Sequence, residues 1–222
     1  MSHQVEHTLQ TATLHWSPMT RNLILPEAEK RFSNRLQMGK GLCSSDDAHF
    51  LTEEVLSKTL QFFCPTVGQV DLRVEALTPD KVLAGGSFFS QGPWSSGLRK
   101  GDSLRLYCLS AGAAGHRLWQ ACGEDPVLAA ATHLLGNEIV YALGRSFDRM
   151  VRNDNQEGKW FKLALLSTGR QKNTRCEWDP VVGRDFFKAF AGADAPVSIS
   201  QAGSFDPTHT VLGLFWRSSI DR

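Results

Sequence analysis

The sequence of 222 residues lacks any long run of apolar side chains. No stretch approaches the roughly 18 apolar residues of a membrane-spanning helix, so the sequence predicts no membrane segment. The polar N-terminus has no basic segment followed by an apolar one, which argues against a secretory signal. The chain also lacks an excess of charge, since 24 Lys and Arg residues face 23 Asp and Glu residues. This balance excludes a protein that coats nucleic acid through its overall charge.

Cysteine is scarce and follows no recognisable pattern. The five cysteines are an odd number, are widely spaced and include no Cys-x-x-Cys pair. Most have apolar neighbours, which predicts buried, reduced thiols in a cytoplasmic protein. The seven histidines form neither a His-x-x-x-His pair nor a zinc-type spacing with cysteine. We therefore expect no metal and no cofactor.

Two common catalytic signatures are missing as well. The sequence has no Gly-x-x-x-x-Gly-Lys-Ser/Thr segment, which excludes a phosphate-binding P-loop. It also has no Gly-x-Ser-x-Gly segment, which excludes the usual nucleophile turn of an α/β-hydrolase. Any site must therefore be sought in the charged groups that remain.

Segments of strand and helix character alternate along the chain. The expected strands are Val5–Trp16, Val70–Val74, Val82–Phe89, Leu104–Cys108, Trp160–Leu166 and a closing pair within Val197–Arg217. The expected helices are one beginning at Pro26 within Arg21–Lys40, then Ser45–Phe63, Pro126–Gly136, Asn137–Val151 and Pro180–Phe190. This order predicts an α+β fold with largely antiparallel sheets. The run from Val5 through Leu166 is read as a ferredoxin-like β-α-β-β-α-β arrangement.

A polar segment, Asn153–Gly158, is the best candidate for a boundary between two regions. It predicts an N-terminal ferredoxin-like region, 1–152, and a C-terminal β-α-β-β region, 153–222, that packs on it. One continuous domain is the alternative. Trp94 lies in a loop rich in Gly, Ser and Pro and is expected to be exposed, whereas Trp160 and Trp216 lie in apolar strands and are expected in the core.

Three basic groups stand out against the neutral whole: Arg21–Lys40, a helix face with arginines at spacings of four and three, and the loop Gly169–Arg175. One interpretation is that each group is a solvated surface, and the arginines of the helix face can also pair with Asp148. The three cations of the Gly169–Arg175 loop repel one another unless an anion is present. If the three groups converge, they predict a local site for the phosphates of RNA. The predicted RNA-binding residues are Lys30, Arg31, Lys40, Arg145, Arg149, Arg152, Arg170, Lys172, Arg175 and Arg217.

The closing segment carries two glycine-bearing stretches, Gly203-Ser204-Phe205 and Leu212-Gly213-Leu214-Phe215. With the ferredoxin-like order and the basic segment after the first strand, they resemble the RAMP-type proteins of CRISPR systems, and most of all the Cas6-type endonucleases that process CRISPR RNA. The resemblance implies metal-independent cleavage, in which the 2′-hydroxyl attacks the neighbouring phosphate with help from a base and from cations. On this interpretation the catalytic residues are Arg21 and Arg35, which stabilise charge, and His49, the base.

Two other functions remain open. The chain is a non-catalytic subunit that holds RNA within a ribonucleoprotein, through shape and backbone contacts, or it is a small-molecule enzyme or protein-interaction module whose arginines are solvated or structural. The first two interpretations imply RNA, structured or single-stranded, and other ribonucleoprotein subunits as partners, and none implies a membrane.

Overall fold

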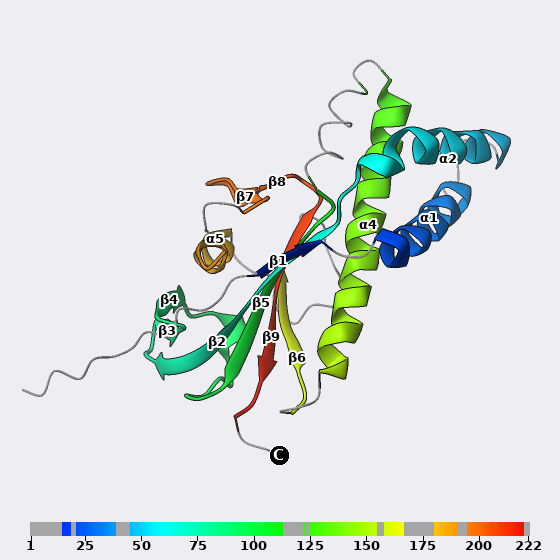
Figure 1. The fold of residues 1–222 in the computed structure, drawn as a ribbon. Helices are drawn as coiled ribbons and strands as arrows, with labels where there is room; N and C mark the ends of the chain where they lie inside the picture. The colour runs from blue at the N-terminus through cyan, green and yellow to red at the C-terminus, as the bar shows by residue number, and fades with distance from the viewer. Residues whose placement is uncertain are drawn as a thin grey trace, which may run out of the picture.

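A computed structural model describes residues 15–18, 21–38, 45–112, 122, 125–154, 158–166, 180–190 and 195–219 (Figure 1). The helices are α1 (Arg21–Met38), α2 (Ser45–Thr59), α4 (Pro126–Asn153) and α5 (Pro180–Lys188), with short 3₁₀ helices η1 (Leu60–Phe62) and η2 (Pro93–Ser95). The strands are β1 (His15–Pro18), β2 (Thr66–Leu77), β3 (Lys81–Ala84), β4 (Ser87–Ser90), β5 (Ser103–Ser110), β6 (Phe161–Leu166), β7 (Ser198–Ile199), β8 (Phe205–Asp206) and β9 (Thr210–Arg217).

The main sheet has the strand order β4-β3-β2-β5-β9-β6, with β1 also paired to β2, and every pairing is antiparallel. The predicted α+β class with antiparallel sheets is confirmed. The ferredoxin-like order is not confirmed, because β9 comes from outside the segment assigned to it and lies between β5 and β6. Strands from both sides of Asn153 share this sheet, so the two expected regions contribute to one structural layer.

The sheet separates two hydrophobic cores, one under α4 and one under α5 (Figure 1). Side chains of a strand alternate between its faces, so Leu104 and Leu106 of β5 pack on the α5 side while Tyr107 and Leu109 pack on the α4 side. Helices α1 and α2 add a further layer outside α4. The predicted α2 and α5 helices and the predicted β2, β5 and β6 strands all form, since their apolar periodicity matches these faces.

Helix α4 is one continuous helix, so the predicted break at Gly136-Asn137 is wrong. Asp125 caps it as expected, accepting hydrogen bonds from the amides of Val127 and Leu128. Gly136 is required for packing, because a Cβ there would lie 2.6 Å from the His209 ring. By length and composition α4 is apolar enough to cross a membrane, yet half of its most apolar stretch is buried inside the protein.

The closing segment does not form the predicted pair of adjacent strands. β7 pairs with β8, and β9 instead occupies the interior of the main sheet between β5 and β6. Most of β9 is buried, which favours a central position over an edge. Gly213 serves close packing, because a Cβ at this position would lie 2.1 Å from Cζ of Tyr107.

Three local expectations are corrected. The predicted strand Val82–Phe89 is two strands, since Gly85 and Gly86 turn the chain with positive φ angles. Trp94 is buried, with Nε1 donating to the Ser90 carbonyl oxygen at 3.1 Å. Helix α1 begins before Pro26, so this proline lies inside it. Among the described cysteines, Cys108 is buried as predicted, whereas Cys122 is half-buried and Cys64 is exposed.

Candidate functional site

Two of the predicted basic groups meet where α1 packs on α4. Glu138 of α4 is 2% exposed and binds two arginines of α1, one through each oxygen. Arg31 Nε lies 2.6 Å from Oε2, and Arg35 Nε lies 2.8 Å from Oε1. The Arg31 guanidinium also stacks on Tyr141, 3.8 Å from the ring centroid. These short contacts fix the angle between the two helices.

The pairing is reciprocal about two to three turns further along α4. Glu27 of α1 faces two arginines of α4, with Arg145 Nε 3.4 Å from Oε1 and Arg149 Nη2 3.3 Å from Oε2. The Arg145 and Arg149 side chains are 56% and 66% exposed, so these pairs are longer and more solvated than those of Glu138. We call this group the α1–α4 seam. It consists of Glu27, Arg31, Arg35, Glu138, Arg145 and Arg149.

The other predicted site residues lie elsewhere. Arg21 donates to the carbonyl oxygens of Leu60 and Gln61, and His49 pairs with Glu53 one turn along α2. No contact among the described residues joins Arg21, Arg35 and His49 to one another. Lys30 is exposed on α1. Lys40, Arg170, Lys172 and Arg175 lie outside the described residues.

Arg152 and Arg217 have partners outside the seam. Arg152 Nε lies 3.1 Å from Asp148 Oδ2, the intramolecular pair that the sequence left open. Arg217 lies over Trp160, with Cζ 4.5 Å from the ring centroid, and Arg105 lies 4.6 Å from the same centroid. Arg105 also pairs with Asp71 and Asp154, and these carboxylates raise its pKa although burial lowers it. This network ties β2, β5 and the end of α4 together.

A second group lies between the C-terminal half of α4 and the sheet face beneath it. It consists of Asp148 of α4 with Tyr107, Lys162 and the apolar Phe215 of the sheet, and we call it the Tyr107 cluster. Lys162 Nζ is 6.0 Å from the ring centroids of Tyr107 and Phe215, and it forms an ion pair with Asp148 Oδ1 at 3.7 Å, longer than a hydrogen bond. The Tyr107 hydroxyl and Asp148 Oδ1 are buried and have no hydrogen-bond partner among the described residues.

The electrostatics of the cluster follow from its burial. Desolvation lowers the pKa of Lys162, and the Arg152 guanidinium lowers it further, while the charge of Asp148 partly offsets both. Burial raises the pKa of Tyr107, and the Asp148 carboxylate adds to the effect. Buried polar atoms are nearly always hydrogen-bonded in proteins. Two such atoms without partners, beside a half-buried amine, therefore mark this cluster as a place for an additional polar group.

Sequence reasoning missed the Tyr107 cluster, although a signal was present. Lys162 is the one charged residue within the apolar strand Phe161–Leu166, and Tyr107 lies in the equally apolar β5. A polar residue within an apolar strand often pairs with a polar side chain on a neighbouring element, and the strand register decides which residues lie beside it. Here Tyr107 lies opposite Gly213, and Lys162 lies opposite Phe215.

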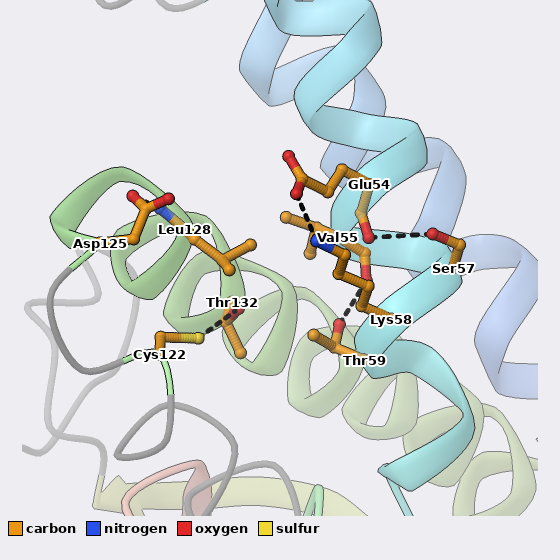
Figure 2. A network of polar contacts seen from close by, with 9 residues as sticks. All are labelled: Glu54, Val55, Ser57, Lys58, Thr59, Cys122, Asp125, Leu128 and Thr132. Atoms are coloured by element: carbon orange, nitrogen blue, oxygen red, sulfur yellow. Dashed lines mark hydrogen bonds and ion pairs between the residues drawn. The ribbon is translucent and has the colours of Figure 1, made fainter.

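A third group of polar contacts lies where the end of α2 comes near the start of α4 (Figure 2). Lys58 Nζ lies 2.5 Å from Glu54 Oε1, and this hydrogen bond raises the pKa of Lys58, with a smaller contribution from Asp125. Cys122 Sγ lies 3.8 Å from Thr132 Oγ1. Asp125 is engaged as the cap of α4, and Lys58 is paired within its own helix, so the contacts of this corner are accounted for by local structure.

No group of three His, Cys, Asp or Glu side chains in the described part of the chain could hold a metal ion. No family model matches the chain, and no curated protein matches it in sequence. A solved structure, "Crystal Structure of the MetH Reactivation Domain bound to AdoHcy", is similar in fold, with a TM-score of 0.62 and 8% sequence identity. The match covers 96% of this chain and 81% of that one. At this identity the comparison shows a shared fold.

Proposed function

We propose that this chain is a small-molecule-binding domain whose ligand belongs to the class of AdoHcy, an adenosyl thioether with an amino-acid tail. A neighbour in fold is the MetH reactivation domain, whose structure contains AdoHcy. The observation that carries the proposal is the Tyr107 cluster, where two buried polar atoms have no hydrogen-bond partner among the described residues. We also propose that the protein acts in the cytoplasm.

The cluster offers the groups that such a ligand needs. The Asp148 carboxylate can accept hydrogen bonds from ribose hydroxyls or from the ligand's ammonium group. The Lys162 ammonium can pair with the ligand's carboxylate, since its side chain is 35% exposed and thus reachable. The buried rings of Tyr107 and Phe215 lie beneath Lys162, each 6.0 Å from its Nζ. Binding sites of this kind are mostly apolar, with a few polar groups that fix orientation.

Isothermal titration of the full chain with AdoHcy tests the proposal. We expect Asp148→Asn and Lys162→Ala to weaken binding by at least about tenfold, because each removes one partner of a half-buried charged group. Lys159→Ala is the matched control, since Lys159 is exposed and precedes the same strand. It should leave affinity within about twofold. Absence of AdoHcy binding by the unaltered chain, or equal effects of all three substitutions, would show the proposal to be wrong.

RNA binding is a separate proposal that rests on the α1–α4 seam and is argued below. Cleavage of CRISPR RNA stays a prediction from the resemblance. Its three expected catalytic side chains have other partners: Arg21 binds carbonyl oxygens, Arg35 binds Glu138 and His49 binds Glu53.

A further inference from the structure

We infer that the α1–α4 seam, together with Lys30, is a binding surface for single-stranded RNA, independent of the Tyr107 cluster. Five cations, Lys30 and the four seam arginines, surround two carboxylates, which leaves an excess of three positive charges on one surface of a nearly neutral chain. Glu29 does not reduce this excess locally, because it lies about 200° around α1 from Glu27. A local excess of this kind attracts the phosphates of a nucleic acid.

The two halves of the seam differ in how readily they release their arginines. Glu138 is buried and holds Arg31 and Arg35 at 2.6 and 2.8 Å, so that half is a fixed support. Glu27 is 28% exposed, and its contacts with Arg145 and Arg149 are 3.4 and 3.3 Å, longer than a strong charge-assisted hydrogen bond. A phosphate group would therefore compete with Glu27 for Arg145 and Arg149.

Both guanidiniums retain donors for that competitor. Each guanidinium carries five N–H groups. Arg145 uses Nε for Glu27, and Arg149 uses Nη2 for Glu27 and Nε for the Arg145 carbonyl oxygen at 3.4 Å. The remaining donors belong to side chains that are more than half exposed. Lys30 lies one turn after Glu27 on α1 and adds a third exposed cation.

An aromatic ring continues the arginine stripe, which favours single-stranded nucleic acid over other polyanions. Tyr141, Arg145 and Arg149 follow each other at intervals of four along α4, about 6 Å apart on one face. Tyr141 is 44% exposed, and Arg31 already stacks on it. Aromatic rings beside cations are how proteins bind unpaired bases and the backbone together.

The test is fluorescence anisotropy with a labelled single-stranded RNA of about 12 nucleotides, titrated with the full chain between about 50 and 200 mM salt. We expect the double variant Arg145→Gln with Arg149→Gln to bind about tenfold more weakly and to lower the salt slope of log K by about 1.4, or about 0.7 for each lost phosphate contact. Glu27→Gln should bind more tightly than the unaltered chain, because it removes the competitor. Arg73→Gln, an exposed arginine of β2, is the matched control and should change little.

Three results would overturn the inference: no RNA binding by the unaltered chain at low salt, weaker binding by Glu27→Gln, or stronger binding to anionic phosphatidylserine vesicles than to RNA. Equal affinity for single-stranded DNA would overturn the assignment to RNA and show that the seam binds single-stranded nucleic acid of either kind. If the double arginine variant fails to fold, Lys30→Gln replaces it, with an expected slope change of about 0.7. AdoHcy titration of the same variants separates this surface from the Tyr107 cluster, since neither test depends on the other site.

Discussion

Helix α4 contributes a carboxylate to each of two regions, and the two carboxylates differ in how completely they are hydrogen-bonded. Towards α1 it presents Glu138, whose buried carboxylate has a tight arginine on each oxygen. Towards the sheet it presents Asp148, whose Oδ1 is buried without a hydrogen bond among the described residues. The first region is satisfied and stabilises the packing of two helices, whereas the second retains capacity for a further polar group. Asp148 is ion-paired with Arg152 and Lys162, but its Oδ1 accepts no hydrogen bond, and a buried polar atom of this kind marks a candidate binding site.

Gly213→Ala should have the largest effect on the Tyr107 cluster. The added Cβ would lie 2.1 Å from Tyr107 Cζ in the centre of the sheet, so we expect a loss of about 4 kcal/mol in the free energy of unfolding. Urea denaturation measures it. The double variant with Tyr107→Ala should lose less than the two single variants summed, because the clash is shared.

Gly144→Ala is the matched control for that prediction. Its Cβ would meet only Leu109 Cδ1, at an ordinary 3.6 Å, inside a helix. It should therefore stabilise the protein by about 0.5 to 1 kcal/mol. Equal losses at both glycines would contradict the assigned role of Gly213.

Asp102→Asn tests a third buried carboxylate, one that is fully satisfied. Asp102 accepts hydrogen bonds from Trp216 Nε1, the Arg99 amide, and the amide and hydroxyl of Ser219. We expect a loss of about 3 kcal/mol at neutral pH, because the amide group meets donors that need an acceptor. Thermal denaturation across pH provides the measurement.

The pH dependence of that variant follows from the pKa of Asp102. Burial opposes ionisation, but the hydrogen bonds from Ser219, Trp216 and Arg99 outweigh it and lower the pKa. The stabilisation is therefore fully present above the unfolded pKa of about 3.9 and is lost as pH falls through the lower folded value. The unaltered chain should lose stability below about pH 4 more steeply than Asp102→Asn. Parallel curves would contradict this assignment.

Glu138→Gln and Glu27→Gln compare the two halves of the α1–α4 seam. Neutralising the buried Glu138 should cost about 2 kcal/mol of unfolding free energy, since two arginines lose their acceptor. Glu27 pairs with exposed arginines, so its loss should cost less than about 1 kcal/mol. Chemical denaturation of both variants gives the ranking, and a reversed order would show that the seam is not divided as described.

Tyr107→Phe should have the smallest effect on stability and the most informative one. Removing a buried hydroxyl that has no partner should leave the free energy of unfolding unchanged or raise it by up to about 1 kcal/mol. A loss above about 1 kcal/mol would mean that the hydroxyl has a partner in solution. Weaker AdoHcy binding by the same variant would assign the hydroxyl to the ligand.

Much of the fold could be predicted because its signals are local. The cap at Asp125, the apolar stripe of α2 and the alternation of β2 each require only neighbouring residues. The failures share a cause, which is that a long-range contact overrides a local preference. Gly136 is typical of a helix end, but it lies inside α4, where the His209 ring leaves no room for a Cβ. Trp94 lies in a polar loop, but Phe186 of α5 packs against it.

For the candidate sites, too, local sequence features could be predicted and long-range contacts could not. Sequence alone identified the basic residues of the α1–α4 seam, because charge can be counted without a structure. It could not assign their partners, since Glu138 lies 107 residues from Arg31. It also missed the Tyr107 cluster, which exists only because the register of β5, β6 and β9 brings Tyr107, Lys162 and Gly213 together beneath α4.

The sequence by itself determined the α+β class, most of the helices and strands, and the position of its cations. The tertiary structure decided that β9 is a central strand, that four arginines share two carboxylates, and that Asp148 and Tyr107 are left with unused hydrogen-bonding capacity. The physical reason is distance along the chain. Periodicity and capping act within a few residues, whereas burial and ion pairing are settled by residues a hundred positions apart.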